Sequence, residues 1–597
     1  MDKRTMRMAA LRQKMDEAGI DAYVVSCGDY HGSEYYSDYF CTLQAMSGFT
    51  GESSLLVIGK TRSALWVDGR FFLQGALELE GTEIRLMRMG MPGVPTVTAY
   101  LKELLPEGGC LGFDGRVITL RQAGEWQKAL AEKQVRLAAT RDLVGEVWED
   151  RPAQVFAPLF ALPERVTGES AASKLARVRE AVKAAGADAH LITSLDDIAW
   201  ILNLRGGDVP CNPVFFSFLL LREADGEWFV HRDAVSEEIR LQAEALGLKL
   251  REYNEIWTDG NVFAGIRRLL LDPARACCFF RAMLPEQVTI VEAANPSTLM
   301  KAVKNRAEQE ALRKAQHQDG LAMVRFLYAL THKPDIEAWD EMDAGDYLEQ
   351  CRREAGAFDL SFPSISAMGT NAAIVHYAPE RGKCARLAAE GLYLIDCGGQ
   401  YPEGTTDITR TVALGPVSER AKFCYTAVLR GMLRLAAAKF PKGCTGYHLD
   451  VLARGPLWDA GLDYRHGTGH GVGFCLNVHE GPNAFRWTLP QDVKAMVPLE
   501  PGMVTTDEPG YYEEGAFGIR IENDLLCVED EHSPYGDYYR FETLTLCPID
   551  LTPVLTEQLT QYEKQQLNAY HERVYQELQR DLPEEIRQWL REVTRAI

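Results

Sequence analysis

Residues 464–482 read YRHGTGHGVGFCLNVHEGP and place three histidines, His466, His470 and His479, among glycines that recur at every second position. A helix is disfavoured here, because each interior glycine costs about 1 kcal/mol relative to alanine. An extended chain rises about 3.3 Å per residue, so His466 and His470 lie roughly 13 Å apart. Two imidazoles at that separation cannot both bind one ion through bonds of about 2.0–2.1 Å. The stretch therefore supplies at most one histidine to a given metal ion, and the other ligands must come from elsewhere in the chain.

The alternating glycines of this stretch indicate a close neighbour. A missing side chain permits another backbone or a ligand to approach, and we expect these glycines to leave room for a bound substrate. A phosphate-binding loop is a poor alternative, because no Gly-Lys-Ser/Thr sequence follows and the spacing does not match a dinucleotide fingerprint.

Two aspartates upstream are candidates for the missing ligands. The segment 393–414, YLIDCGGQYPEGTTDITRTVAL, has two β-rich runs on either side of the turn signal QYPEG. A hairpin centred on Tyr401–Pro402 places Asp396 opposite Asp407, with Cβ atoms about 4.5–5.5 Å apart. Two ionised carboxylates so placed repel each other unless a proton or a cation lies between them. The alternative, one turn cap and one solvated acid, is less favoured for a facing pair.

Two glutamates downstream are less informative by themselves. Residues 498–512, PLEPGMVTTDEPGYY, and 517–527, FGIRIENDLLC, each have the pattern of a strand. In the second run isoleucines alternate with Arg520 and Glu522, which therefore share a face. Glu508 precedes a Pro-Gly turn. A solvated strand edge and a turn acid explain these residues equally well without further evidence.

Length and charge restrict the class of protein. The chain has 597 residues and a net charge of 64 − 85 = −21. This length predicts two to four domains, and the acidic balance disfavours nucleic acid or an anionic membrane as the main partner. The longest apolar stretch, PVFFSFLLL at 213–221, is too short to span a membrane. The charged N-terminus lacks the apolar core of a signal peptide, so we expect a cytoplasmic protein.

The first 300 residues contain a weak repeat. RMAALRQKMDEAGIDAYVV at 7–25 and KLARVREAVKAAGADAHLI at 174–192 each combine helical periodicity, a Gly-x-Asp-Ala step at Gly19 or Gly186, and a β-rich run. A second pair of matching segments, both strand–turn–strand in pattern, lies at 54–70 and 218–232. We interpret this as two copies of an α/β unit, each with a mixed sheet and flanking helices.

Composition also suggests where the domains meet. A Pro-rich segment at 155–170 separates the two copies, residues 297–330 have the pattern of one long amphipathic helix, and residues 555–597 form a charged, helical tail. The predicted domains are 1–160, 161–303 and 304–597, and the fold class is α/β (α+β).

Four stretches, in their order and spacing, resemble the metal-site motifs of the pita-bread metallopeptidases, the family of methionine aminopeptidase, prolidase, aminopeptidase P and creatinase. These are IDCGGQYPEGTTDITRT (395–411), HGTGHGVGFCLNVHEGP (466–482), TTDEPGYY (505–512) and GIRIEND (518–524). LNLRGGDVPCNPVFFSFLLL (202–221) and LSFPSISAMGTNAAIVHYAP (360–379) further resemble the long, three-domain form of aminopeptidase P. The resemblance runs from about residue 20 to residue 550. It implies two creatinase-like N-terminal domains and a C-terminal pita-bread catalytic domain.

This resemblance implies a dinuclear metal centre. Its five ligands would be Asp396, Asp407, His470, Glu508 and Glu522. Asp407 and Glu522 would bridge the ions, Asp396 would complete one site, and His470 with Glu508 would complete the other. The family's chemistry implies two divalent ions per subunit, with manganese preferred and zinc or cobalt as alternatives. Their charge would offset the repulsion between the aspartates.

The reaction implied is hydrolysis of the first bond of a peptide with proline second, Xaa-|-Pro-Yaa, by attack of a metal-bridging hydroxide. Glu508 would accept the proton. His376 and His479 would be catalytic, donating hydrogen bonds to the substrate carbonyl and to the developing oxyanion. His466 would line the prolyl pocket, and Arg520 would orient the ligands.

Two alternatives remain open. A prolidase would cleave Xaa-Pro dipeptides, and a non-catalytic pita-bread protein would bind peptide or protein without turnover, although such a protein should have lost ligands. The expected partners are peptides with a penultimate proline and a second copy of the chain, without nucleic acid or membrane. Arg70 could reach a neighbouring active site in such a homodimer, but a solvated surface arginine is an equal alternative.

Overall fold

The computed structural model describes residues 3–139, 141–490 and 496–597. It divides the chain into two compact units. Unit 1 comprises Met1–Leu162 and Glu169–Thr298, and unit 2 comprises Pro163–Gly168 and Leu299–Ile597. Among the described helices, none combines the length and the apolar composition that crossing a membrane requires.

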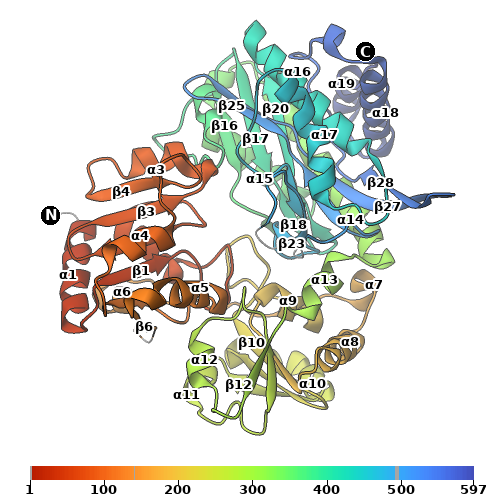
Figure 1. The fold of residues 1–597 in the computed structure, drawn as a ribbon. Coiled ribbons are helices and arrows are strands. Elements are labelled where there is room, and N and C mark those ends of the chain that lie inside the picture. Colours follow the sequence, from red (N-terminus) through yellow and green to blue (C-terminus); the bar gives the residue numbers. More distant parts are fainter. Residues whose placement is uncertain (1–2, 140, 491–495) are drawn as a thin grey trace. The chain divides into compact units, whose positions relative to one another are not determined.

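Unit 1 contains the same arrangement twice (Figure 1). The first sheet has the strand order β4-β3-β2-β1-β5-β6, and the second has the order β12-β11-β10-β8-β13-β14. In each, a central strand pairs antiparallel with the hairpin that follows it and parallel with a later strand. The first copy consists of α1 (Lys3–Glu17), β1 (Ala22–Ser26), α2 (Thr42–Ser47), β2 (Leu55–Gly59), β3 (Ser63–Val67), α3 (Phe72–Glu78), β4 (Ile84–Arg88), α4 (Val97–Leu104), β5 (Cys110–Phe113), α5 (Leu120–Leu130), β6 (Arg136–Ala138) and α6 (Leu143–Val147). The second consists of α8 (Ala171–Ala184), β8 (Ala189–Ile192), α9 (Leu195–Leu202), β10 (Ser217–Arg222), β11 (Gly226–Val230), α10 (Glu237–Ala245), β12 (Leu248–Glu252), α11 (Glu255–Thr258), β13 (Arg268–Leu271), α12 (Phe279–Met283) and β14 (Thr289–Glu292).

The repeated Gly-x-Asp-Ala step ends the first helix of each copy in the same way. Gly19 and Gly186 have φ angles of 63° and 76°, the left-handed region that glycine enters without a steric cost. The residue after each glycine donates its N–H back across the helix end, Ile20 to Met15 O and Ala187 to Val182 O. The predicted duplication is therefore confirmed.

Unit 2 is a mixed α/β structure whose strands are covered by long helices. Helices α16 and α17 pack against each other, and α18 and α19 pack on α14 (Figure 1). The predicted helical tail is confirmed by α18 and α19. The elements are α7 (Glu164–Thr167), α14 (Arg306–His332), α15 (Glu341–Glu354), β15 (Asp359–Leu360), β16 (Ile365–Met368), η6 (Gly369–Ala373), β17 (Leu392–Cys397), β18 (Gly399–Tyr401), β19 (Gly404–Thr405), β20 (Ile408–Ala413), α16 (Glu419–Ala436), β21 (Lys439–Pro441), α17 (Gly446–Asp459), β22 (Gly469–Gly471), β23 (Glu480–Phe485), β24 (Val504–Asp507), β25 (Gly510–Glu513), β26 (Phe517–Arg520), β27 (Asn523–Ser533), β28 (Gly536–Thr543), α18 (Gln561–Leu578) and α19 (Glu584–Val593).

The single helix expected over 297–330 is wrong. Helix α13 (Pro296–Ala302) ends before α14 begins. Asn305 caps α14, because its side chain accepts from Glu308 N while the Glu308 carboxylate accepts from Asn305 N, at 3.1 and 2.9 Å. This capping box starts a new helix. Because the apolar periodicity continues through the break, the pattern of apolar residues does not reveal where α13 ends.

The predicted hairpin around residue 401 is present, but its register differs. Tyr401 pairs with Gly404, so the turn is centred between Pro402 and Glu403. Strand β17 consequently pairs with β20 so that Asp396 lies opposite Thr409. The prediction that Asp396 lies directly opposite Asp407 is therefore wrong, because the residue opposite Asp396 is two positions further along the chain. Because two residues is one full side-chain period, this shift preserves the face on which a side chain lies.

Candidate metal centre

The five predicted ligands come from separate segments of unit 2. Asp396 lies in β17, and Asp407 directly precedes β20. His470 is the central residue of β22, which confirms an extended conformation for the histidine-rich stretch. Glu508 lies between β24 and β25, and Glu522 lies between β26 and β27.

The two continuous strands expected over 498–512 and 517–527 are wrong, and the reason concerns the site. Each run leaves one sheet and enters another, because β24 pairs with β27 whereas β25 pairs with β26. The first break falls at Glu508–Pro509, where proline lacks the N–H that a strand ladder needs, and the second at Ile521–Glu522. Glu508 and Glu522 therefore lie where the chain passes from one sheet to the other.

The ligand atoms of Asp407, His470 and Glu522 all lie within 4.8 Å of one another. His470 Nε2 is 3.5 Å from Asp407 Oδ2 and 3.5 Å from Glu508 Oε1. The other ring nitrogen, Nδ1, lies 2.9 Å from Gly471 O. A carbonyl only accepts, so Nδ1 carries the proton and Nε2 presents a lone pair to the cluster.

Arg520 connects the fourth acid to this cluster. Its guanidinium donates to Asp396 Oδ2 from Nε and Nη2, at 3.1 and 2.5 Å. Thr409, which lies opposite Asp396, donates to Glu522 Oε2 at 2.6 Å and accepts from Arg520 Nε at 3.3 Å. Arg520 and Glu522 thus face the same region, as the strand pattern predicted, although a strand break separates them.

Tyr512 is a contact that sequence reasoning missed. Arg520 Nη1 lies 2.6 Å from the Tyr512 hydroxyl oxygen, and His466 Nε2 lies 2.9 Å from the same oxygen. A guanidinium only donates, so the tyrosine oxygen accepts from Arg520 and its O–H is available to His466. The available signal was its position within TTDEPGYY, two residues after the turn that follows Glu508.

Burial and mutual repulsion govern the electrostatics. Burial raises the pKa of Asp407 and of Glu522 well above the usual range, and the neighbouring carboxylates add to both shifts. Burial also raises the pKa of Glu508 to about 7, against the lowering effect of the Arg520 guanidinium. Four carboxylates around one guanidinium leave excess negative charge in a low-dielectric site, which a bound cation would offset.

The donor set fits metal ions. Asp396 Oδ1 and Asp407 Oδ1 are buried and accept no hydrogen bond from the described residues, and a bound cation would supply the missing partner. Four carboxylates with one imidazole form a set suited to divalent ions such as manganese.

The three remaining predicted histidines lie at or beside this cluster. The rings of His479 and His470 are 4.2 Å apart and nearly perpendicular. His466 Nδ1 lies 3.7 Å from Glu508 Oε2, the carboxylate oxygen that is not directed at His470. His376 follows η6, and the carbonyl of its neighbour Val375 accepts from Arg520 Nη2 at 3.4 Å.

The glycines of the opening stretch accommodate backbone. A Cβ on Gly469 would lie 1.8 Å from Thr506 O, and one on Gly471 would lie 2.0 Å from Glu480 O. Strand β22 lies between β23 and β24 in the sheet. The expectation that these glycines leave room for substrate is therefore wrong at these two positions, where neighbouring strands fill the space.

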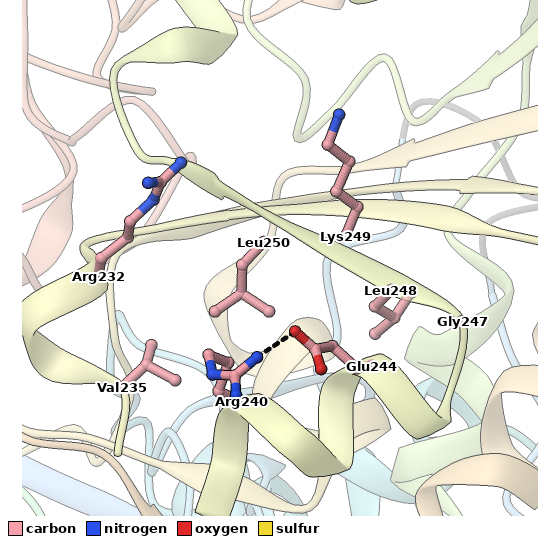
Figure 2. Close-up of a pocket in the computed structure, with 8 residues that line it drawn as sticks. All are labelled: Arg232, Val235, Arg240, Glu244, Gly247, Leu248, Lys249 and Leu250. Carbon is pink, nitrogen blue, oxygen red and sulfur yellow. Dashed lines mark hydrogen bonds and ion pairs between the residues drawn. The ribbon is translucent and has the colours of Figure 1, made fainter. Parts of the chain in front are cut away.

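A surface pocket of 560 Å³ in unit 1 has a different character (Figure 2). It lies beside α10 and the edge strand β12. Arg240 in this pocket pairs with Glu244 and, at 2.5 Å, with Glu237. Its polar groups form surface ion pairs of the kind that contribute little, and it holds no cluster of metal-binding or nucleophilic side chains.

Two other basic residues of unit 1, Arg70 and His31, also have local partners. Arg70 donates to both oxygens of Asp68, from Nε to Oδ1 at 3.1 Å and from Nη2 to Oδ2 at 2.8 Å. His31 is buried, with its ring nitrogens 2.9 Å from Thr193 O and 2.8 Å from the Tyr253 hydroxyl. These contacts give both side chains a structural role within unit 1.

Comparison with known proteins identifies the family. Residues 310–529 match metallopeptidase family M24, residues 7–146 and 150–308 each match the creatinase/prolidase N-terminal domain, and residues 537–597 match the C-terminal region of peptidase M24. Aminopeptidase P1 of Arabidopsis thaliana is 37% identical over 631 residues, covering 97% of each chain. The chain belongs to the aminopeptidase P branch of metallopeptidase family M24. A probable Xaa-Pro aminopeptidase P of Botryotinia fuckeliana is 36% identical over 96% of this chain and 89% of its own.

Solved structures match this chain to different extents. The X-prolyl aminopeptidase of Caenorhabditis elegans, described as a cytosolic enzyme with a di-nuclear active site, matches over 100% of both chains with a TM-score of 0.93 and 31% identity. The Xaa-Pro dipeptidase of Bacillus anthracis covers only 64% of this chain, with a TM-score of 0.52 and 26% identity. The full-length architecture is thus that of aminopeptidase P.

Proposed function

We propose that this protein is a metal-dependent aminopeptidase that hydrolyses the first peptide bond of peptides with proline in the second position and releases the N-terminal residue. The observation that carries the proposal is the convergence of Asp407, His470, Glu508 and Glu522, with Asp396 connected through Arg520, in a buried and oxygen-rich cluster. Relatives that match the whole chain and bear the aminopeptidase P name support it.

Five residues would hold two divalent ions in each subunit, and we propose manganese. Asp407 and Glu522 would bridge, Asp396 would complete one site, and His470 with Glu508 would complete the other. Bound ions would supply Lewis-acid polarisation of the scissile carbonyl and activation of the attacking water.

The chain's own groups would move protons and orient the substrate. Glu508 would accept the proton of the attacking water as the general base. Arg520 would fix which oxygen of Asp396 faces the metals, because it donates to Oδ2 alone. His479 would donate a hydrogen bond to the developing oxyanion, His376 to a substrate carbonyl, and His466 would border the prolyl side of the site.

A peptide-cleavage panel tests the proposal. The protein is stripped with a chelator, reloaded with manganese, zinc or cobalt, and offered Xaa-Pro-Yaa peptides and Xaa-Pro dipeptides with the same first residue. We expect release of Xaa from the longer peptides, loss of turnover on stripping, and the highest rate with manganese. Preference for the dipeptide would indicate a prolidase. No turnover despite two bound ions would indicate a binding protein.

We further propose a cytoplasmic homodimer with the domain division 1–160, 161–303 and 304–597. The cytosolic description of the C. elegans neighbour supports the compartment. Net charge argues against nucleic acid as a partner. Light scattering on the purified protein would measure the oligomeric state, and limited proteolysis should cut near residue 160.

A further inference from the structure

A buried lysine outside the metal cluster joins the two ends of the loop that connects His470 to His479. We call residues 471–479 the histidine loop. Lys304 Nζ donates to Val472 O at one end of this loop and to Glu480 Oε1 directly after its other end, both at 2.6 Å. The side chains of Lys304 and Glu480 are each only 1% exposed. The ammonium therefore spans the base of the loop in a region without solvent.

The backbone of Lys304 is itself held in place. Its N–H donates to Gly502 O at 2.9 Å, and its carbonyl accepts from Gln309 Nε2 at 2.8 Å. Gly502 has a φ of 102°, and a Cβ there would lie 2.6 Å from Lys304 O. Only glycine permits this close approach at a positive φ. The ammonium thus extends from a fixed point toward the loop.

The buried charges of Lys304 and Glu480 make the link between the two loop ends difficult to break. Hydrogen bonds from a buried ammonium to a carboxylate and a carbonyl are charge-assisted, and removing one partner would leave the other charge buried without compensation. A second ammonium, that of Lys301, lies 3.5 Å from the opposite oxygen of Glu480. The loop ends cannot separate without exposing this group of charges.

The loop ends determine where the two histidines lie. His470 is two residues before Val472, and His479 directly precedes Glu480. Their rings are 4.2 Å apart, although nine positions separate them in the chain (479 − 470 = 9). Pairing of β22 with β23 places Gly471 opposite Glu480. Lys304 adds a charged link from Val472 to Glu480 at the base of the loop, and so restricts the separation between the proposed metal ligand and the proposed oxyanion donor.

We propose that Lys304 is a positioning residue for hydrolysis, which acts by holding His479 at a set distance from His470. This inference rests on the proposed function, since it assigns a catalytic consequence to the position of His479.

The test compares kcat, KM and bound metal for Lys304→Met and for the matched control Lys301→Met on an Xaa-Pro-Yaa peptide. Lys304→Met should lower kcat about 10- to 100-fold, the range seen when a supporting contact of a metal site is lost, with KM near the wild-type value and two ions retained. Lys301→Met removes an ammonium from the same carboxylate and should leave kcat close to wild type. An equal loss of kcat in both variants would show that buried charge alone matters and would overturn the proposal.

A double-mutant cycle with His479→Ala isolates the route of the effect. If Lys304 acts through His479, Lys304→Met should change kcat little once His479 is absent. The same fold-loss in both backgrounds would overturn the inference. Wild-type activity in His479→Ala alone would instead contradict the proposed role of His479, so the two failures are distinguishable.

A further variant covers the case in which Lys304→Met does not fold. Lys301→Met/Lys304→Met/Glu480→Gln removes all three buried charges together and should recover the unfolding temperature. Because the connection to Val472 is still missing, kcat should remain lowered in this variant. A folded triple variant with wild-type kcat would overturn the proposal.

Discussion

Arg520 Nη2 and Nε both donate to the same oxygen of Asp396, Oδ2, at 2.5 and 3.1 Å. The other oxygen, Oδ1, is buried and accepts no hydrogen bond from the described part of the chain. The guanidinium therefore occupies one side of the carboxylate and leaves the opposite side for a metal ion. One arginine thus offsets part of the negative charge and also orients a proposed ligand.

Replacement of Arg520 with methionine should destabilise the metal-free protein more than the metal-loaded protein. The change keeps the volume of the side chain but leaves Asp396 buried beside three other carboxylates. Loss of one partner of a buried ion pair costs about 3–5 kcal/mol, and bound cations would restore part of it. Thermal unfolding with chelator and with manganese measures the difference. Equal shifts under both conditions would show that Arg520 and the metals do not share the task of neutralising the acids.

Asp407→Asn should abolish turnover while the fold persists. Asparagine keeps the shape and the backbone N–H that Asp524 accepts at 3.3 Å but cannot bridge two cations as a carboxylate does. We expect activity to fall by more than about 100-fold, beyond the loss typical of an indirect contact. The metal-free variant should unfold at or above the wild-type temperature, since one repelling charge is gone. Wild-type turnover would refute the bridging assignment.

Gly469→Ala and Gly467→Ala form a matched pair within the histidine-rich stretch. A Cβ at 469 would lie 1.8 Å from Thr506 O, whereas the nearest atom to a Cβ at 467 is 3.4 Å away. Overpacking costs about 1–3 kcal/mol, and at 469 it would also displace His470 from Asp407. We expect weaker metal binding and a lower unfolding temperature for Gly469→Ala, with Gly467→Ala close to wild type. Calorimetric metal titration and thermal unfolding test both, and equal tolerance would contradict the tight strand packing.

A buried histidine in α18 should make unit 2 sensitive to acid. Burial lowers the pKa of His571 to about 3, and its Nε2 accepts from Ile549 N at 3.1 Å, so the folded state holds it neutral. The unfolded state binds this proton below about pH 6.5. Stability from this group is therefore complete above that pH and is lost as pH falls toward 3, by about 1.4 kcal/mol per unit.

Denaturant unfolding of His571→Gln between pH 7 and 4 measures this effect, because glutamine can accept from Ile549 N without titrating in that range. The variant should lose less stability than wild type as the pH falls. His532→Gln is the control. His532 is exposed and its ion pair with Asp537 lies at the surface, where such pairs contribute little, so this variant should follow the wild-type profile. Identical pH profiles for wild type and His571→Gln would refute the assignment.

Local features of the chain were predictable because neighbouring residues create them. The Gly19 and Gly186 helix ends, the strand–turn–strand pairs and the extended conformation around His470 each depend on a few adjacent positions. Motif order also sufficed to name acids and histidines that the fold brings together. Helix boundaries and strand register were harder to predict from the sequence. The Asn305 cap divides a continuous apolar pattern into two helices. A shift of one residue in the centre of the turn changes the register of the β17–β20 pair.

The sequence by itself determined which residue types are available for metal chemistry, the duplicated α/β architecture, and that His466 and His470, on one extended strand, cannot share an ion. Only the tertiary structure decided how the site is held. Thr409 contacts Glu522 across 113 positions, and Lys304 contacts Glu480 across 176. Such pairs form when packing brings distant segments together and encloses their charges, and no local pattern of residues encodes that distance.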